Sequence, residues 1–229
     1  MNNDSCLNSQ YYIKKKPLAV AWSFIDLNLS GAVSTSGISH YPLKKTEIFS
    51  QEFKNYGRLD GVSKAVCNSI ASLLKELNLY PSDSKLNIPI FFCSENASCF
   101  SDIKYFSDYL DFNETAGRAN KFLYTLPTSP LGEASVHFKL TGTILYVTDS
   151  NNSFLKAFQL LDNYFYFNSK NSEYAIIGFA ESYNSLKADA VFFIMKNSDD
   201  NLDCIEMDLN KINSFSQIKK QIMENFVKI

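Results

Sequence analysis

The chain has few of the residues that build metal sites and disulfide frameworks. It contains only two histidines and one tryptophan in 229 residues. Its five cysteines are odd in number, widely scattered, and include no C-x-x-C pair. Cys93 and Cys99 lie six residues apart, with no histidine nearby to complete a zinc site. We therefore expect no metal site and no disulfide framework, and the thiols should be reduced.

Positive charge and long apolar segments are also lacking. The formal net charge is -2, which argues against a nucleic-acid partner because such proteins favour a basic face. The longest apolar runs, such as Ala190–Met195, are too short to span a bilayer. The first ten residues are polar and do not resemble a signal peptide. A cytoplasmic protein without a membrane span is the expectation.

Well-known cofactor-binding and catalytic motifs are missing as well. The sequence has no G-x-G-x-x-G, no G-x-x-x-x-G-K, no H-E-x-x-H and no G-x-S-x-G. We therefore expect no cofactor.

Strand and helix patterns alternate along the chain. The expected strands are Leu18–Ile25, Ile88–Ser94, Ile144–Thr148, Tyr174–Phe179 and Ala188–Met195. The expected helices are Asp60–Leu77, Asp102–Leu110, Leu131–Leu140 and one from Asp149 to about Phe165. This alternation predicts an α/β fold with a mostly parallel sheet covered on both faces. The last two strands are too close in sequence for a parallel crossover and should pair antiparallel.

The sequence indicates one domain over residues 1–229. Its core should lie at about 18–195. Residues 196–229 form an addition with a short strand at Leu202–Leu209 and a helix that opens at Asn213 or Ser214.

One segment carries a family resemblance. Residues 122–142, FLYTLPTSPLGEASVHFKLTG, resemble the segment before the nucleophile in β-ketoacyl synthases, which carry T-L-P-N-x-x-x-G-E ahead of a strand and a sharp turn. Residues 57–66 are similar to an early helix of that family, and Ala188–Met195 to its closing strand. The resemblance implies half of a thiolase-type fold, a five-stranded sheet with helices on both faces. A complete synthase has two such halves, and its catalytic histidines come from the second.

The nucleophile of that family is missing from this chain. A condensing enzyme needs a thiolate at a helix N-terminus, where free amides and the helix dipole lower the thiol pKa. Counting from Gly142 without gaps, the family's cysteine falls on Asn151, and an amide cannot form a thioester. A serine would need a base. The candidate serines are Ser150 and Ser153, with His137 as the candidate base and His40 in an irregular region. The resemblance thus favours a protein without condensing activity.

The resemblance also implies a partner surface. In the family, the strand before the nucleophile pairs with the same strand of a partner, and here that strand is made of Ile144, Leu145, Tyr146, Val147 and Thr148. The chain is similar to short synthase-like proteins found beside full synthases in aryl-polyene and related polyketide pathways, and more loosely to chain-length factors. This implies pairing with a full-length β-ketoacyl synthase and an influence on product length. The aromatic residues that could line an acyl tunnel are Phe122, Tyr124, Phe154 and Phe158.

Two alternatives remain open from the residues. One is a serine-dependent acyl hydrolase or transferase. The other is a self-pairing protein without catalysis that binds acyl groups or acyl carrier protein.

Overall fold

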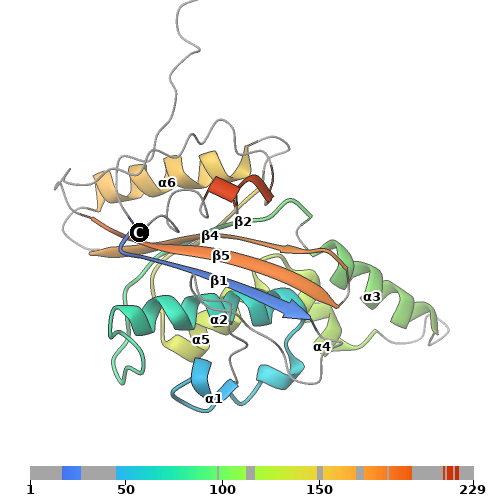
Figure 1. Cartoon of the computed structure of the whole chain (residues 1–229). Coiled ribbons are helices and arrows are strands. Elements are labelled where there is room, and N and C mark those ends of the chain that lie inside the picture. The colour runs from blue at the N-terminus through green and yellow to red at the C-terminus, as the bar shows by residue number, and fades with distance from the viewer. Residues whose placement is uncertain are drawn as a thin grey trace, which may run out of the picture.

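A five-stranded sheet forms the centre of the fold. The computed structural model describes residues 17–26, 45–96, 98–111, 117–148, 152–168, 173–184, 186–197, 214, 216–218 and 220–221. The strands are β1 (Ala19–Asp26), β2 (Ile90–Cys93), β3 (Ile144–Val147), β4 (Tyr174–Ser182) and β5 (Lys187–Lys196). Their order in the sheet is β1-β5-β4-β2-β3 (Figure 1). All five expected strands are therefore present.

The sheet is mixed, which corrects the expectation of a mostly parallel one. β2 pairs in parallel with both β3 and β4. β5 pairs antiparallel with both β4 and β1. The β4–β5 hairpin was expected, because the connection is too short for a crossover. The antiparallel position of β1 was not expected, because an apolar strand pattern does not reveal the direction of its neighbour.

Helices cover both faces of this sheet, as expected. The helices are α1 (Lys45–Ile48), α2 (Gly61–Glu76), α3 (Cys99–Asp111), α4 (Ala119–Phe122), α5 (Ser129–Phe138) and α6 (Ser153–Phe167), with 3-10 turns η1 (Tyr56–Arg58) and η2 (Leu123–Thr125). α2 and α5 pack on one face and α6 on the other, while α3 lies at one end of the strands (Figure 1). Two hydrophobic clusters result, one on each side of the sheet.

The strand residues alternate between these clusters. In β5, Ala190, Phe192 and Ile194 face the α2 cluster, whereas Val191 and Phe193 face the α6 cluster. Successive side chains of a strand point to opposite faces, so a central strand with helices on both sides must be apolar throughout. This explains why most residues of β5 are hydrophobic.

Local signals set the ends of α2. Asp60 is its N-cap, and the carboxylate accepts a hydrogen bond of 2.8 Å from the backbone amide of Ser63. The helix ends at Glu76, and Leu77 is its C-cap. Asn78 follows with a φ of 55°, a left-handed conformation that asparagine tolerates better than most residues.

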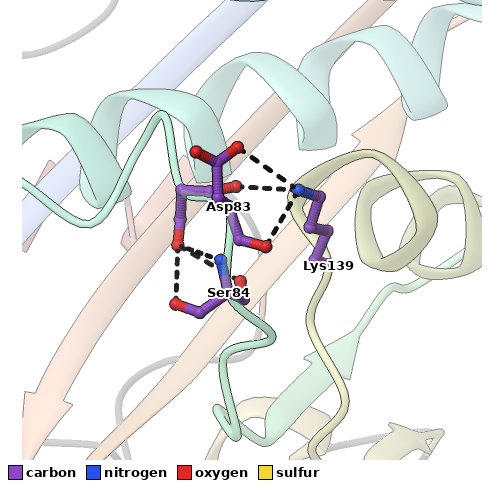
Figure 2. Close-up of polar contacts among 4 residues, drawn as sticks. Asp83, Ser84 and Lys139 are labelled. Atoms are coloured by element: carbon purple, nitrogen blue, oxygen red, sulfur yellow. Dashed lines mark hydrogen bonds and ion pairs between the residues drawn. The ribbon is translucent and has the colours of Figure 1, made fainter.

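α5 begins two residues earlier than expected. Pro130 lies within the first turn, where its missing N–H needs no partner, so the proline does not exclude this position from the helix. The helix ends at Phe138 because Lys139 adopts a φ of 56°. The Lys139 ammonium donates to the carbonyl oxygens of Ser82 and Asp83 at 3.1 and 3.2 Å, which ties this helix end to the turn after α2 (Figure 2).

The expected C-terminal addition is described only in part. The expected strand Leu202–Leu209 lies outside the described residues. Residues 216–218 and 220–221 are helical, in agreement with the expected amphipathic helix. Ile218 is fully buried in the α6 cluster, so this short helical segment packs on the same face of the sheet as α6.

Candidate functional site

β3 lies at one edge of the sheet. It pairs with β2 on one side, and no other described strand lies on its other side. Ile144 and Tyr146 are partly buried and pack against the α2 cluster, and Val147 belongs to the α6 cluster. Leu145 and Thr148 are exposed. An unpaired strand edge offers free backbone N–H and C=O groups to another chain.

The loop after β3 leads directly into α6. Asn151, the residue expected at the family's nucleophile position, and the candidate serine Ser150 both lie outside the described residues. Ser153 is the first residue of α6 and is 93% buried. The N-cap residue is Asn152, whose side chain makes no capping hydrogen bond and whose Oδ1 is buried without a partner among the described residues. The entry to α6 is thus built from serine and asparagine side chains.

His137 lies in an aromatic environment on the other face of the sheet. It belongs to α5, and its ring stacks on Phe53 with 4.0 Å between the ring centroids. Its Nε2 is 3.0 Å from the Tyr80 hydroxyl. Burial, with a smaller contribution from Lys45, lowers the pKa of His137 to about 4. The structure does not bring His137 to Ser153, because α5 and α6 cover opposite faces of the sheet. His40 lies outside the described residues.

The described thiols lie on other elements, although Cys93 of β2 pairs in register with Val147, the last residue of β3. Cys67 is buried in α2 and Cys93 in β2, and burial raises the pKa of both well above the ordinary value. Cys99 is exposed at the start of α3. The sequence contains no cysteine between Cys99 and Cys204, so the segment from β3 through α6 and on to β5 carries no thiol.

The fold is similar to that of solved structures. The chain is similar to a chain in the complex of the ketosynthase ApeO with its chain length factor ApeC from Xenorhabdus doucetiae. The TM-score is 0.53, the identity 14%, and 80% of each chain is covered. It is also similar to the ishigamide ketosynthase/chain length factor, with a TM-score of 0.53 and 10% identity. That match covers 79% of this chain and 62% of the other, so the chain spans less than two thirds of the second protein. Neither a family model nor a curated protein matches the sequence.

The chain has a ketosynthase-like fold. This confirms the thiolase-type architecture that the motif around residues 122–142 implied. In this ketosynthase-like sheet β3 is one of the two edge strands, and β1 is the other.

The four aromatic residues expected to line a tunnel do not lie together. Phe154 and Phe158 are buried in the α6 cluster, where their rings make an edge-to-face contact at 5.1 Å. Tyr124 packs against the α2 cluster on the other face of the sheet. Phe122 is 51% exposed on α4 and contacts Tyr105 of α3. The four residues therefore belong to three separate environments.

Glu133, which lies within the family-like segment, has a neighbour from the same segment. It accepts a hydrogen bond of 3.4 Å from the Tyr124 hydroxyl. The burial of Tyr124 and the charge of Glu133 raise the pKa of this phenol to about 12. This contact links η2 to α5.

The sequence interpretation missed an exposed apolar stripe on α3. Ile103, Phe106 and Leu110 are between 47 and 59% exposed, at a spacing that places them on one face of the helix. The neighbouring residues Phe122 and Leu123 are also exposed. Asp108 on the same helix is buried and pairs with Arg118 and Lys121, which holds α4 against α3. The stripe was visible in the sequence, but its exposure depends on which face of α3 packs against α4 and η2.

Two further properties concern the described residues alone. None of their helices is both long and apolar enough to cross a membrane. None of their histidine, cysteine, aspartate and glutamate side chains gather in a group of three or more that could hold a metal ion.

Proposed function

We propose that this chain is a non-catalytic, ketosynthase-like subunit that pairs with a full-length β-ketoacyl synthase through the edge of β3. In fatty-acid or polyketide biosynthesis of the aryl-polyene kind, it would influence the length of the product. The observation that carries this proposal is the combination of a ketosynthase-like sheet, an edge strand with an unpaired side, and a segment from β3 to α6 without cysteine.

The chemistry of condensation supports the non-catalytic part of the proposal. Acyl transfer in a synthase requires a thiolate, and neither asparagine nor an unactivated serine replaces it. Ser153 is buried, and His137, the histidine within the described part of the chain, lies on the opposite face of the sheet with its pKa lowered to about 4. The described candidates, Ser153 and His137, therefore give no support to serine-dependent hydrolysis.

The edge strand supports the pairing part. Adding a partner strand along the four residues of β3 would form about four backbone hydrogen bonds, each worth about 1 kcal/mol net. Burial of the exposed Leu145 side chain would add to this. The two similar structures are those of ketosynthase and chain length factor proteins, which supports a synthase as the partner ahead of a second copy of this chain.

Co-expression with a full-length β-ketoacyl synthase from the same organism tests the proposal. We expect a one-to-one complex by size-exclusion chromatography with light scattering. Leu145→Lys places a charge on the edge strand and should weaken the complex at least about tenfold. Val136→Lys is the matched control, because Val136 is an apolar residue, 82% exposed, on α5.

Three results would contradict the proposal: no complex with the synthase, equal effects of the two substitutions, or turnover of an acyl substrate by the isolated chain. The same preparations test the effect on product length. The synthase alone and the complex should release products of different length. Products of identical length would contradict the proposed chain-length role, but they would not contradict the proposed pairing with the synthase.

A further inference from the structure

A cavity of about 330 Å³ lies beside the first turn of α2, away from the β3 edge. Four parts of the chain form its wall: residues 57–64, α3, the α4–η2 segment, and the turn between β4 and β5. Its volume lies in the range of small-molecule sites. The charged and aromatic side chains that define its chemistry are Arg58, Asp60, Lys64, Lys104, Lys121 and Tyr124.

The positive charge in this cavity exceeds the negative charge. Lys121 is paired with Asp108, so the two charges cancel. Arg58, Lys64 and Lys104 make no ion pair with any described residue. The chain as a whole has a net charge of -2, so this local excess does not follow from its composition.

The single carboxylate of the cavity wall is already engaged. One oxygen of Asp60 accepts a hydrogen bond from the Ser63 amide and the other from the Ser101 hydroxyl, both at 2.8 Å. Its charge raises the pKa of Lys64, but burial and the neighbouring Lys104 lower it, and the net shift is downward. Lys64 and Lys104 both line the cavity, and Asp60 is the one carboxylate among its lining residues.

We infer that this cavity binds the phosphate group of a small phosphate ester, with Arg58, Lys64 and Lys104 as the charged contacts and the Tyr124 ring as a wall for the esterified group. A phosphate monoester carries close to two negative charges and three acceptor oxygens, which matches several cations from different elements. A guanidinium adds paired, directional hydrogen bonds to phosphate oxygens. A ligand with a single carboxylate would neutralise only one of the three positive charges of Arg58, Lys64 and Lys104. The site lies away from β3 and does not depend on the pairing proposed above.

Calorimetric titration of the full chain tests the inference. We expect saturable binding of inorganic pyrophosphate and of ADP, and no binding of adenosine, which lacks the phosphate. The double variant K64Q/K104Q should weaken binding of both ligands at least about tenfold, because each lysine supplies a charge-assisted contact. The matched control is K85Q/K156Q, which removes two exposed lysines outside the cavity wall.

Asp60→Asn is a variant that should change the ligand affinity in the opposite direction. Asparagine is an equally good N-cap, so α2 should be retained while the cavity loses its negative charge. Pyrophosphate should bind severalfold more tightly to this variant, an effect that a purely structural role of Asp60 would not produce. Thermal melting without ligand checks that every variant is folded. No binding of pyrophosphate and ADP, or equal binding by K64Q/K104Q and its control, would overturn the inference.

Discussion

The protonation state of His137 is set by the residues that surround its ring. Phe53 stacks on the ring, and Lys45 adds a nearby positive charge, so the folded protein favours the neutral imidazole. The pKa is about 4 in the folded state against an ordinary value of 6.5. As the pH falls from 6.5 toward 4, the unfolded chain binds a proton that the folded chain does not, and stability is lost over this window.

We therefore expect the free energy of unfolding to fall by about 1 kcal/mol more in the wild type than in His137→Gln between pH 7 and pH 5. This value allows for the partial exposure of the ring. Urea denaturation at the two pH values measures it. His40→Gln is the control for the other histidine. If the free energy of unfolding becomes less dependent on pH in His40→Gln and not in His137→Gln, then His137 is not the group that causes the loss of stability.

Gly178 shows how closely one residue can set the packing of the sheet. It lies in β4 directly opposite Phe192 of β5, and a Cβ atom at Gly178 would lie 2.1 Å from the Phe192 ring. The Phe192 ring would have to leave its packed position in the α2 cluster. Because this disturbs the packing of the core, Gly178→Ala should lower the free energy of unfolding by about 1–3 kcal/mol.

Gly132 is the matched control for this substitution. It lies in α5, and a Cβ atom there would have no neighbour within 4 Å. Gly132→Ala should therefore stabilise the protein by about 0.5–1 kcal/mol through the better helix propensity of alanine. Chemical denaturation of both variants tests the pair. Equal effects of the two substitutions would show that the contact with Phe192 does not limit the packing.

At the scale of elements, the sequence predicts what depends on local patterns. α2 follows from its apolar stripe and from Asp60 at its start, and the β4–β5 hairpin follows from the short connection. The length of β4 was underestimated: its pairing with β5 continues to Ser182, beyond the apolar run, because backbone hydrogen bonds of a ladder do not require apolar side chains.

The candidate site was less accessible to prediction, because it depends on which face each element covers. Phe122, Tyr124, Phe154 and Phe158 are all aromatic and close to the family-like segment, yet α6 places two of them on the face opposite Tyr124. The cavity beside α2 combines residues from four parts of the chain, so no single motif contains it. Both features arise from the three-dimensional assembly of elements whose local structure the sequence predicts well.

At the scale of the whole molecule, the face of the sheet under α6 is closed partly by the C-terminal residues. The α6 cluster includes Phe154, Leu161 and Phe165 from the helix and Ile218 from the C-terminal segment, more than fifty residues later in the sequence. Ile218 is fully buried, and its backbone amide donates to the Ser214 carbonyl oxygen at 3.2 Å. At the position of Ile218, the C-terminal segment thus covers apolar surface of the α6 cluster.

If the C-terminal segment is needed to close this face, truncating Ile218 should destabilise the whole fold. Ile218→Ala removes three buried carbon atoms and should lower the free energy of unfolding by about 2–4 kcal/mol. Ser216→Ala is the matched control, because Ser216 is exposed in the same helical turn and should change stability by less than about 0.5 kcal/mol. Urea denaturation followed by tryptophan fluorescence reports the loss, since Trp22 of β1 packs against the same cluster. A wild-type stability in Ile218→Ala would show that α6 and the sheet hold this face together without the C-terminal segment.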